Sequence, residues 1–158
     1  MKRALVLACG LLVLPVAAAY AQLPVELARD QQALVASKDP ALAANKRLVY
    51  DYWREVLQTH DTSRAAHYMA ADFIEHNPVV PTGLKGFTGF LGKLERRALK
   101  PTVDNLVSIV AEGNLVVLAF REELKDPKKP GSKYTTTWFD MFRVSNGKIV
   151  EHWDYGTK

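Results

Sequence analysis

Two carboxylates stand among aromatic residues near the end of this chain, in residues 134–155, YTTTWFDMFRVSNGKIVEHWDY. Asp140 is flanked at alternate positions by Trp138 and Phe142, and Glu151 by Trp153. Apolar surroundings raise the pKa of a carboxyl group towards the range in which it can both accept and return a proton. His76, in the segment FIEHNP, is a natural proton-transfer partner. The residue types therefore favour Asp140 and His76 as a catalytic acid/base pair.

The stretch that holds these carboxylates has the pattern of a β-hairpin. Asn146-Gly147 separates two runs of β-branched and aromatic residues, which is a strong signal for a two-residue turn. A two-residue turn predicts five cross-strand pairs, namely Ser145–Lys148, Val144–Ile149, Phe142–Glu151, Asp140–Trp153 and Trp138–Tyr155. Alternation then places Asp140 and Glu151 on one aromatic face, and His152 on the opposite face.

Further residues are expected to contact a ligand in a pocket on that face. They are aromatic or polar side chains of the hairpin, of the preceding strand or of the segments before it: Tyr52, Trp53, Asn77, Arg121, Trp138, Phe142, Glu151 and Trp153. A histidine pair at HxH or HExxH spacing is absent from the sequence, so we expect no protein-held metal and no cofactor.

Each of these residues also has a purely structural interpretation. Asp140 can be a buried carboxylate that hydrogen-bonds a neighbouring element, and His76 or Asn77 can fix the turn before Pro78. The aromatic residues can simply pack the core. Glu151 can be solvated at the rim, and Arg121 can pair with a surface carboxylate.

The periodicity along the chain predicts helices first and strands afterwards. Apolar residues recur at helical spacing in residues 25–37, 40–59 and 83–99, with a short helix ending near residue 69. Residues 72–78 are expected to be extended, and the period changes to two in residues 103–111 and 115–124, around Gly113-Asn114. This order predicts a single α+β domain in which the helix carrying Tyr52 and Trp53 covers a curved antiparallel sheet around a cavity.

The N-terminus has the pattern of a cleavable signal peptide. Lys2 and Arg3 precede an apolar run, and Ala19-Tyr20-Ala21 fits a cleavage site. We expect residues 1–21 to be removed and the protein to be periplasmic or secreted, without a membrane anchor. A lipoprotein signal at Cys9 is an alternative.

Composition excludes several other classes of protein. Without residues 1–21 the chain keeps 19 basic and 17 acidic side chains, so its formal charge falls from +4 to +2. The basic residues are dispersed, which argues against nucleic-acid binding. The single cysteine lies in the leader, so the remaining chain has neither a disulfide nor thiol chemistry.

Several motifs together resemble the SnoaL-like branch of the NTF2-like superfamily. They are Asn45-Lys46 before the Tyr52-Trp53 helix, FIEHNP at residues 73–78, FDMFRV at 139–144 and GKIVEHWD at 147–154. The resemblance implies an NTF2-like cone over residues 42–158, preceded by a helical extension at residues 22–41. For SnoaL-type polyketide cyclases it implies a cavity aspartate acting as acid/base with a nearby histidine, which correspond here to Asp140 and His76. Residues 115–121, LVVLAFR, depart from the pattern because the relatives often carry histidines there.

Three functions are compatible with these observations. The first is a cofactor-free enzyme that performs aldol-type cyclisation, isomerisation or hydration on a small, largely apolar carbonyl compound. The second is a binding or carrier module that uses the same cavity, and the third is a structural domain whose cone is filled by its own side chains. We also expect a homodimer through an outer sheet face bearing Phe139, Met141 and Val150.

Overall fold

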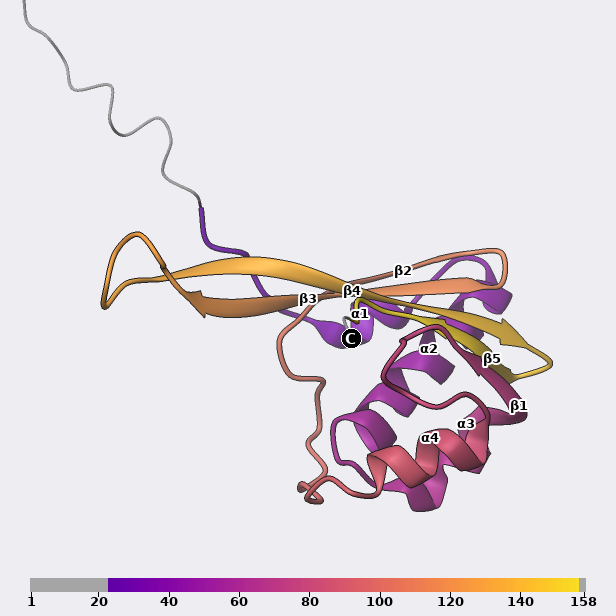
Figure 1. Cartoon of the computed structure of the whole chain (residues 1–158). Helices are drawn as coiled ribbons and strands as arrows, with labels where there is room; N and C mark the ends of the chain where they lie inside the picture. Colours follow the sequence, from indigo (N-terminus) through magenta and orange to yellow (C-terminus); the bar gives the residue numbers. More distant parts are fainter. Residues whose placement is uncertain (1–22, 157–158) are drawn as a thin grey trace, which may run out of the picture.

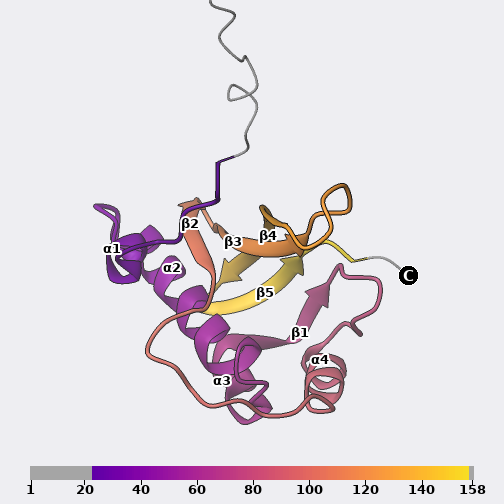
Figure 2. The ribbon, with the colours of Figure 1, turned by 90° about the vertical axis from the view of Figure 1, so that its left-hand side faces the viewer.

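A curved five-stranded sheet carries helices on one of its faces (Figures 1 and 2). The computed structural model describes residues 23–156, so the expected signal peptide lies outside the described residues. The helices are α1 (Gln31–Val35), α2 (Pro40–Tyr52), the π-helical turn η2 (Trp53–Leu57), the 3₁₀ turn η3 (Thr62–Arg64), α3 (Ala65–Tyr68) and α4 (Leu84–Leu91). The strands are β1 (Met69–Glu75), β2 (Leu106–Glu112), β3 (Leu115–Lys125), β4 (Lys133–Ser145) and β5 (Lys148–Trp153).

The strands lie in the order β1-β5-β4-β3-β2. Strands β2 to β5 pair antiparallel with their neighbours, as predicted, whereas β1 pairs parallel to β5. Parallel neighbours need a long crossover. The sequence between β1 and β5 supplies it, and the first strand of the chain therefore lies beside the last one (Figure 2).

The helix α2 covers the inner face of the sheet, as the sequence predicted. Asp39 begins this helix by accepting hydrogen bonds from the amides of Ala41 and Leu42, and Pro40 occupies the first turn. The buried ring of Tyr52 then lies 5.8 Å, centroid to centroid, from the ring of Phe142 on β4. Within residues 23–156, every helix is too short or too polar to cross a lipid bilayer.

Two predicted helices are shorter than expected. In residues 25–37 only α1 is helical, because the amides of Val25 and Ala28 donate to Thr135 and Leu106 of the sheet instead. In residues 83–99 the helix α4 ends at Leu91. Gly92 closes α4 with a hydrogen bond to Thr88, and Leu94 and Leu99 beyond it are exposed, so a longer helix would not bury them.

The β4–β5 hairpin has the predicted turn but not the predicted register beyond it. Asn146 and Gly147 both have positive φ, and Val144 pairs with Ile149 as expected. The next pair is Arg143 with Glu151, so two residues of β5 oppose one of β4 and Val150 forms a β-bulge. The predicted pairs of Phe142 with Glu151 and of Asp140 with Trp153 are therefore wrong, and β5 ends at Trp153, before Tyr155.

Candidate active site

The bulge exchanges which residues of β5 face the interior. His152 now pairs with Phe142 and turns inward, where its ring stacks on that of Phe142 at a centroid distance of 4.4 Å. A one-residue slip moves every later side chain to the other face of the sheet. The predicted position of His152 on the outer face is therefore wrong, and so are the predicted inner positions of Glu151 and Trp153.

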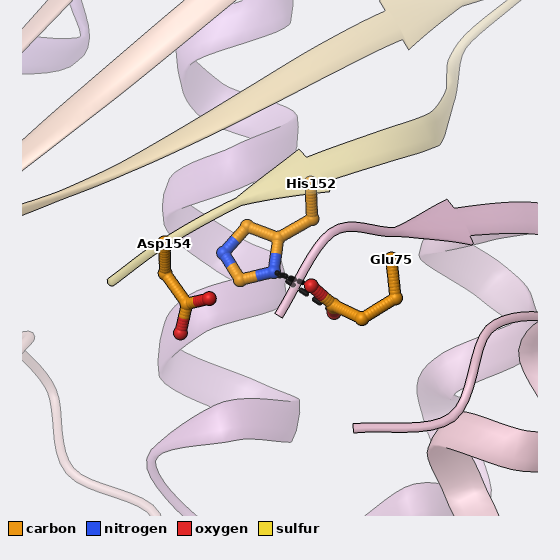
Figure 3. A group of neighbouring side chains, drawn as sticks. All are labelled: Glu75, His152 and Asp154. Atoms are coloured by element: carbon orange, nitrogen blue, oxygen red, sulfur yellow. Dashed lines mark hydrogen bonds and ion pairs between the residues drawn. The ribbon is translucent and has the colours of Figure 1, made fainter. Parts of the chain in front are cut away.

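His152 forms hydrogen bonds with two buried carboxylates. Its Nε2 lies 2.9 Å from Oδ1 of Asp140. Its Nδ1 lies 3.0 Å from Oε2 of Glu75 at the end of β1 (Figure 3). Both ring nitrogens face acceptors, which favours the doubly protonated imidazolium. Burial alone would lower the pKa of His152, but the hydrogen bonds and charges of Asp140 and Glu75 outweigh it and raise that pKa to about 9.

Asp140 is the buried end of this row of three side chains. Asp140 is 2% exposed, and its second carboxylate oxygen, Oδ2, is buried without a hydrogen-bond partner among the described residues. Burial raises the pKa of Asp140, and the negative charges of Asp154 and Glu75 add to the rise, while the hydrogen bond from His152 opposes it. A buried carboxyl group with a raised pKa and a free oxygen is the type of group that can serve as an acid or base, which makes Asp140 a candidate.

The segment after β1 supports this arrangement. The amide of Asn77 donates to Oε1 of Glu75 at 3.0 Å, and its side-chain amide donates to Asp154 at 3.0 Å. Its side-chain oxygen accepts from the amide of Val79, which is the turn role predicted for Asn before Pro. Asn77 therefore fixes the turn and also orients two carboxylates of the site.

Glu75, His152 and Asp154 also have the spacing of metal ligands, with one potential ligand atom of each lying within 4.8 Å of the others (Figure 3). Both nitrogens of His152 are already engaged with carboxylates, however, so a metal ion would have to displace a proton from this ring. We therefore interpret the imidazolium as the cation of this cluster.

His76, predicted to be the partner of Asp140, lies on the outer face of the sheet. Its Nε2 is 2.8 Å from Oε1 of Glu151, and its ring stacks on Trp153 at 5.0 Å. Arg143 also binds Glu151, at 2.7 Å, and its guanidinium lies over Trp153. The predicted contact between His76 and Asp140 is therefore replaced by an outer cluster of four residues, and Glu151 lies in that cluster rather than beside Asp140.

The other predicted site residues divide into two groups. Tyr52, Trp53, Trp138 and Phe142 gather around Asp140 on the inner side, as predicted. Burial, with the nearby charges of Glu75 and Asp140, holds the pKa of Tyr52 well above its usual value, so its phenol is neutral. Arg121 does not join this group, and instead lines a surface pocket of about 330 Å³ together with Lys133 and Tyr134.

The sequence did contain one signal of the correct register. The predicted hairpin buried Glu151 on an aromatic face without an opposite charge, which is rare in proteins. The observed bulge instead exposes Glu151 to Arg143 and His76 and buries His152 between two acids. Glu75 was missed because its role depends on the parallel pairing of β1 with β5.

Comparison with known proteins agrees with this architecture. The model of the SnoaL-like domain matches residues 49–152, which is well over half of the chain, and the chain therefore belongs to the SnoaL-like domain family. A comparison with curated proteins gives no match.

Solved structures of low sequence identity share the fold. A protein of Acidithiobacillus ferrooxidans named as a polyketide cyclase is 18% identical, with a TM-score of 0.53 over 76% of this chain and 90% of that one. An NTF2-like protein of Anabaena variabilis is 17% identical, with a TM-score of 0.52 over 73% and 90% of the two chains. An LEH-like epoxide hydrolase of M. tuberculosis is 16% identical, with a TM-score of 0.51 over 76% and 83%. These similarities confirm the predicted α+β fold of the NTF2-like type.

Proposed function

We propose that this protein is a cofactor-independent enzyme that performs acid/base chemistry on a small, largely apolar carbonyl compound. The observation that supports the proposal best is the carboxyl group of Asp140, which is held at Oδ1 by His152 and has a buried Oδ2 that lacks a hydrogen-bond partner within residues 23–156. Structural carboxylates usually have both oxygens hydrogen-bonded when they are buried.

The proposed chemistry begins with proton transfer to Asp140. As a carboxylate, Asp140 takes a proton from the carbon beside the substrate carbonyl through Oδ2, and leaves an enolate. The same proton then returns to carbon at another position in an isomerisation, or to the alkoxide formed when the enolate attacks a second carbonyl in an aldol closure. His152 stays protonated and offsets the negative charge, while Glu75 keeps its ring in place.

The test compares two carboxylates of the same sheet. A panel of small ketones and aldehydes is screened with the wild-type protein, and the best substrate is then assayed with Asp140→Asn and Glu151→Gln. Asp140→Asn is expected to reduce turnover about a hundredfold or more, because positioned acid/base groups contribute on that scale. Glu151→Gln, on the outer face, serves as the control and should retain turnover.

The folding of the Asp140→Asn variant separates catalysis from architecture. The amide oxygen of asparagine can still accept from His152, and the substitution removes one buried carboxylate from a cluster with three. We expect the variant to stay folded but to lose some stability near neutral pH, because the buried imidazolium of His152 keeps only Glu75 as its paired charge. An unfolded variant would show instead that Asp140 is a structural residue, and would contradict the proposal.

A binding or carrier module is the second candidate function. The observation that favours it is the close packing of aromatic rings around Asp140, which offers contact area to an apolar ligand without requiring catalysis. Saturable binding of a carbonyl compound by the wild type, with no product formed, would establish this function in place of the enzyme.

We also propose that the protein is exported and acts as a homodimer. The pattern of residues 1–21 supports export. Support for the dimer comes from the outer sheet face, where Phe139 is 57% exposed and lies beside a row formed by Val110, Val117, Met141 and Trp153 on four paired strands. A symmetric second copy is the commonest cover for such an apolar face on a soluble domain.

A further inference from the structure

The indole of Trp53 packs against the inward-facing aromatic residues on either side of Asp140. Trp138, Asp140 and Phe142 occupy successive inward positions of β4. The Trp53 ring centroid is 5.8 Å from that of Trp138 and 6.3 Å from that of Phe142. A ring that lies near both flanking side chains also lies close to the stretch of β4 that carries Asp140 between them.

The place occupied by this indole is an aromatic site. Phe120, paired with Trp138 across the strands, lies 4.3 Å from Trp53 and 4.4 Å from Trp138, the latter with nearly parallel rings. Trp53 is half-buried, whereas Phe120 and Asp140 are almost fully buried. The half-buried indole therefore belongs to an aromatic group that adjoins the buried Asp140, and flat rings form the walls around it.

The backbone at Trp53 is also unusual. The regular helix α2 gives way to the π-helical turn η2 at this residue, and the amide of Gln58 donates to the Trp53 carbonyl to close the wider turn. Such turns are rare in proteins and are frequently found at functional sites.

Five surface pockets within residues 23–156 are lined by other side chains, and none of them includes Asp140 or His152. Because Asp140 is 2% exposed, a ligand that reaches its Oδ2 has to displace a side chain. Trp53 is the best candidate, because it is half-buried, packs against the residues that flank Asp140 and lies at a break in the helical repeat.

We propose that Trp53 determines the specificity of the Asp140 site, and that the ligand is a flat conjugated carbonyl compound of about the size of an indole. The ligand takes the place of the Trp53 ring against Phe120, Trp138 and Phe142, and thereby presents its carbonyl end to Asp140. The chemistry that follows rests on the function proposed above, whereas the binding position does not require any turnover.

The binding position can be tested with indole as the probe. Trp53→Ala is expected to open an apolar site of the shape of the removed ring, and engineered apolar cavities bind small aromatic molecules. Titration calorimetry should show indole binding to Trp53→Ala about tenfold or more tighter than to the wild type, given the apolar area that an indole buries. Binding should also shift the NMR resonances of the His152 ring, which are assigned through His152→Gln.

Two variants serve as controls. Trp153→Ala removes a tryptophan side chain from the outer face, where Trp153 stacks on His76. This variant should bind indole no better than the wild type. The double variant Trp53→Ala/Trp138→Ala removes a wall of the proposed site and should lose most of the gain.

The outcomes separate this inference from the proposed function. The inference is overturned if Trp53→Ala binds indole no better than the wild type does. It is also overturned if indole binds without shifting the NMR resonances of the His152 ring. If Trp53→Ala does not fold, Trp53→Leu is measured with the same probe and judged by the same criteria.

Indole binding at His152 without turnover of any carbonyl compound supports the binding position and contradicts the enzyme. Turnover that depends on Asp140 but is unchanged in Trp53→Ala or Trp53→Leu supports the enzyme and overturns the role of Trp53.

Discussion

Within the described residues, His152 carries the positive charge at the centre of a site that contains three carboxylates, those of Glu75, Asp140 and Asp154. A buried charge is expensive unless it is paired and hydrogen-bonded, and here the imidazolium is both. The excess of negative charge raises the pKa of Asp140 further, which makes this carboxyl group the natural place for an extra proton.

The elevated pKa of His152 predicts a dependence of stability on pH. An unfolded histidine titrates near its model value of 6.5, whereas folded His152 titrates at about 9. Its contribution is therefore fully present below pH 6.5 and is lost as the pH rises through about 9, and amounts to about 3 kcal/mol at 1.36 kcal/mol for each unit of pKa. Urea unfolding at about pH 6 and about pH 10 measures this contribution to the free energy of unfolding. His152→Gln should lose most of this dependence, and equal pH dependence in the two proteins would contradict the prediction.

Glu75 is predicted to act on Asp140 through His152, in addition to the direct effect of its negative charge. Glu75→Gln removes the charge beside Nδ1, so the pKa of His152 should fall while the imidazole remains next to Asp140. NMR titration of the His152 ring measures this shift, and the pH profile of turnover should move with it. Glu151→Gln provides the control, because that carboxylate contacts His76 and Arg143 instead. An unchanged pKa of His152 in Glu75→Gln would exclude this role.

Among the secondary-structure elements, the β4–β5 turn gives the sharpest prediction. Gly147 has a φ of +70°, and nothing lies within 4 Å of the position where a Cβ would be built. Gly147→Val should therefore cost about 1 kcal/mol or more through backbone strain alone, since a β-branched residue resists positive φ.

The control for this substitution is Gly89→Ala. Gly89 also has open space around a built Cβ, but it lies within α4 and lacks a positive φ. Alanine there should stabilise the domain slightly, by about 0.5–1 kcal/mol. Denaturant unfolding measures both variants, and an equal effect of the two substitutions would show that the turn geometry is not what matters at Gly147.

The same hairpin shows what sequence reasoning could and could not provide. Local chemistry determines the turn, because Asn146 and Gly147 suit positive φ, and the alternation of β4 correctly places Trp138, Asp140 and Phe142 on one face. The bulge at Val150 depends on contacts outside the hairpin. His152 is placed by Glu75, which lies 77 residues earlier in the sequence. Local patterns therefore predicted the acid of the candidate site but assigned it the wrong histidine.

For the whole molecule, the proposed dimer predicts a change of oligomeric state. Phe139→Lys places a charge in the exposed apolar face and should convert a dimer to a monomer without unfolding the domain, because the side chain is 57% exposed. Sedimentation or light scattering measures the mass. Lys125→Glu, on an exposed position at the end of β3, is a suitable control. A wild-type protein that is monomeric at all accessible concentrations would contradict the dimer.

The proposed export predicts a specific N-terminus. If the Ala19-Tyr20-Ala21 site is used, the mature protein begins at Gln22. Mass spectrometry of protein recovered outside the cytoplasm measures this directly. An intact leader would contradict the prediction, and a lipid-modified Cys9 would support the lipoprotein alternative.

The parallel pairing of β1 with β5 has a consequence for the order of assembly. Strand β1 is synthesised before the middle of the domain, yet its strand neighbour is the last one made. Closing so long a loop costs entropy that is recovered only when the pairing forms. Glu75 can therefore meet His152 only after the final strand has emerged, so a partly synthesised or C-terminally shortened chain has the acid of the site without its histidine. The candidate site is therefore assembled only when β5 pairs with β1.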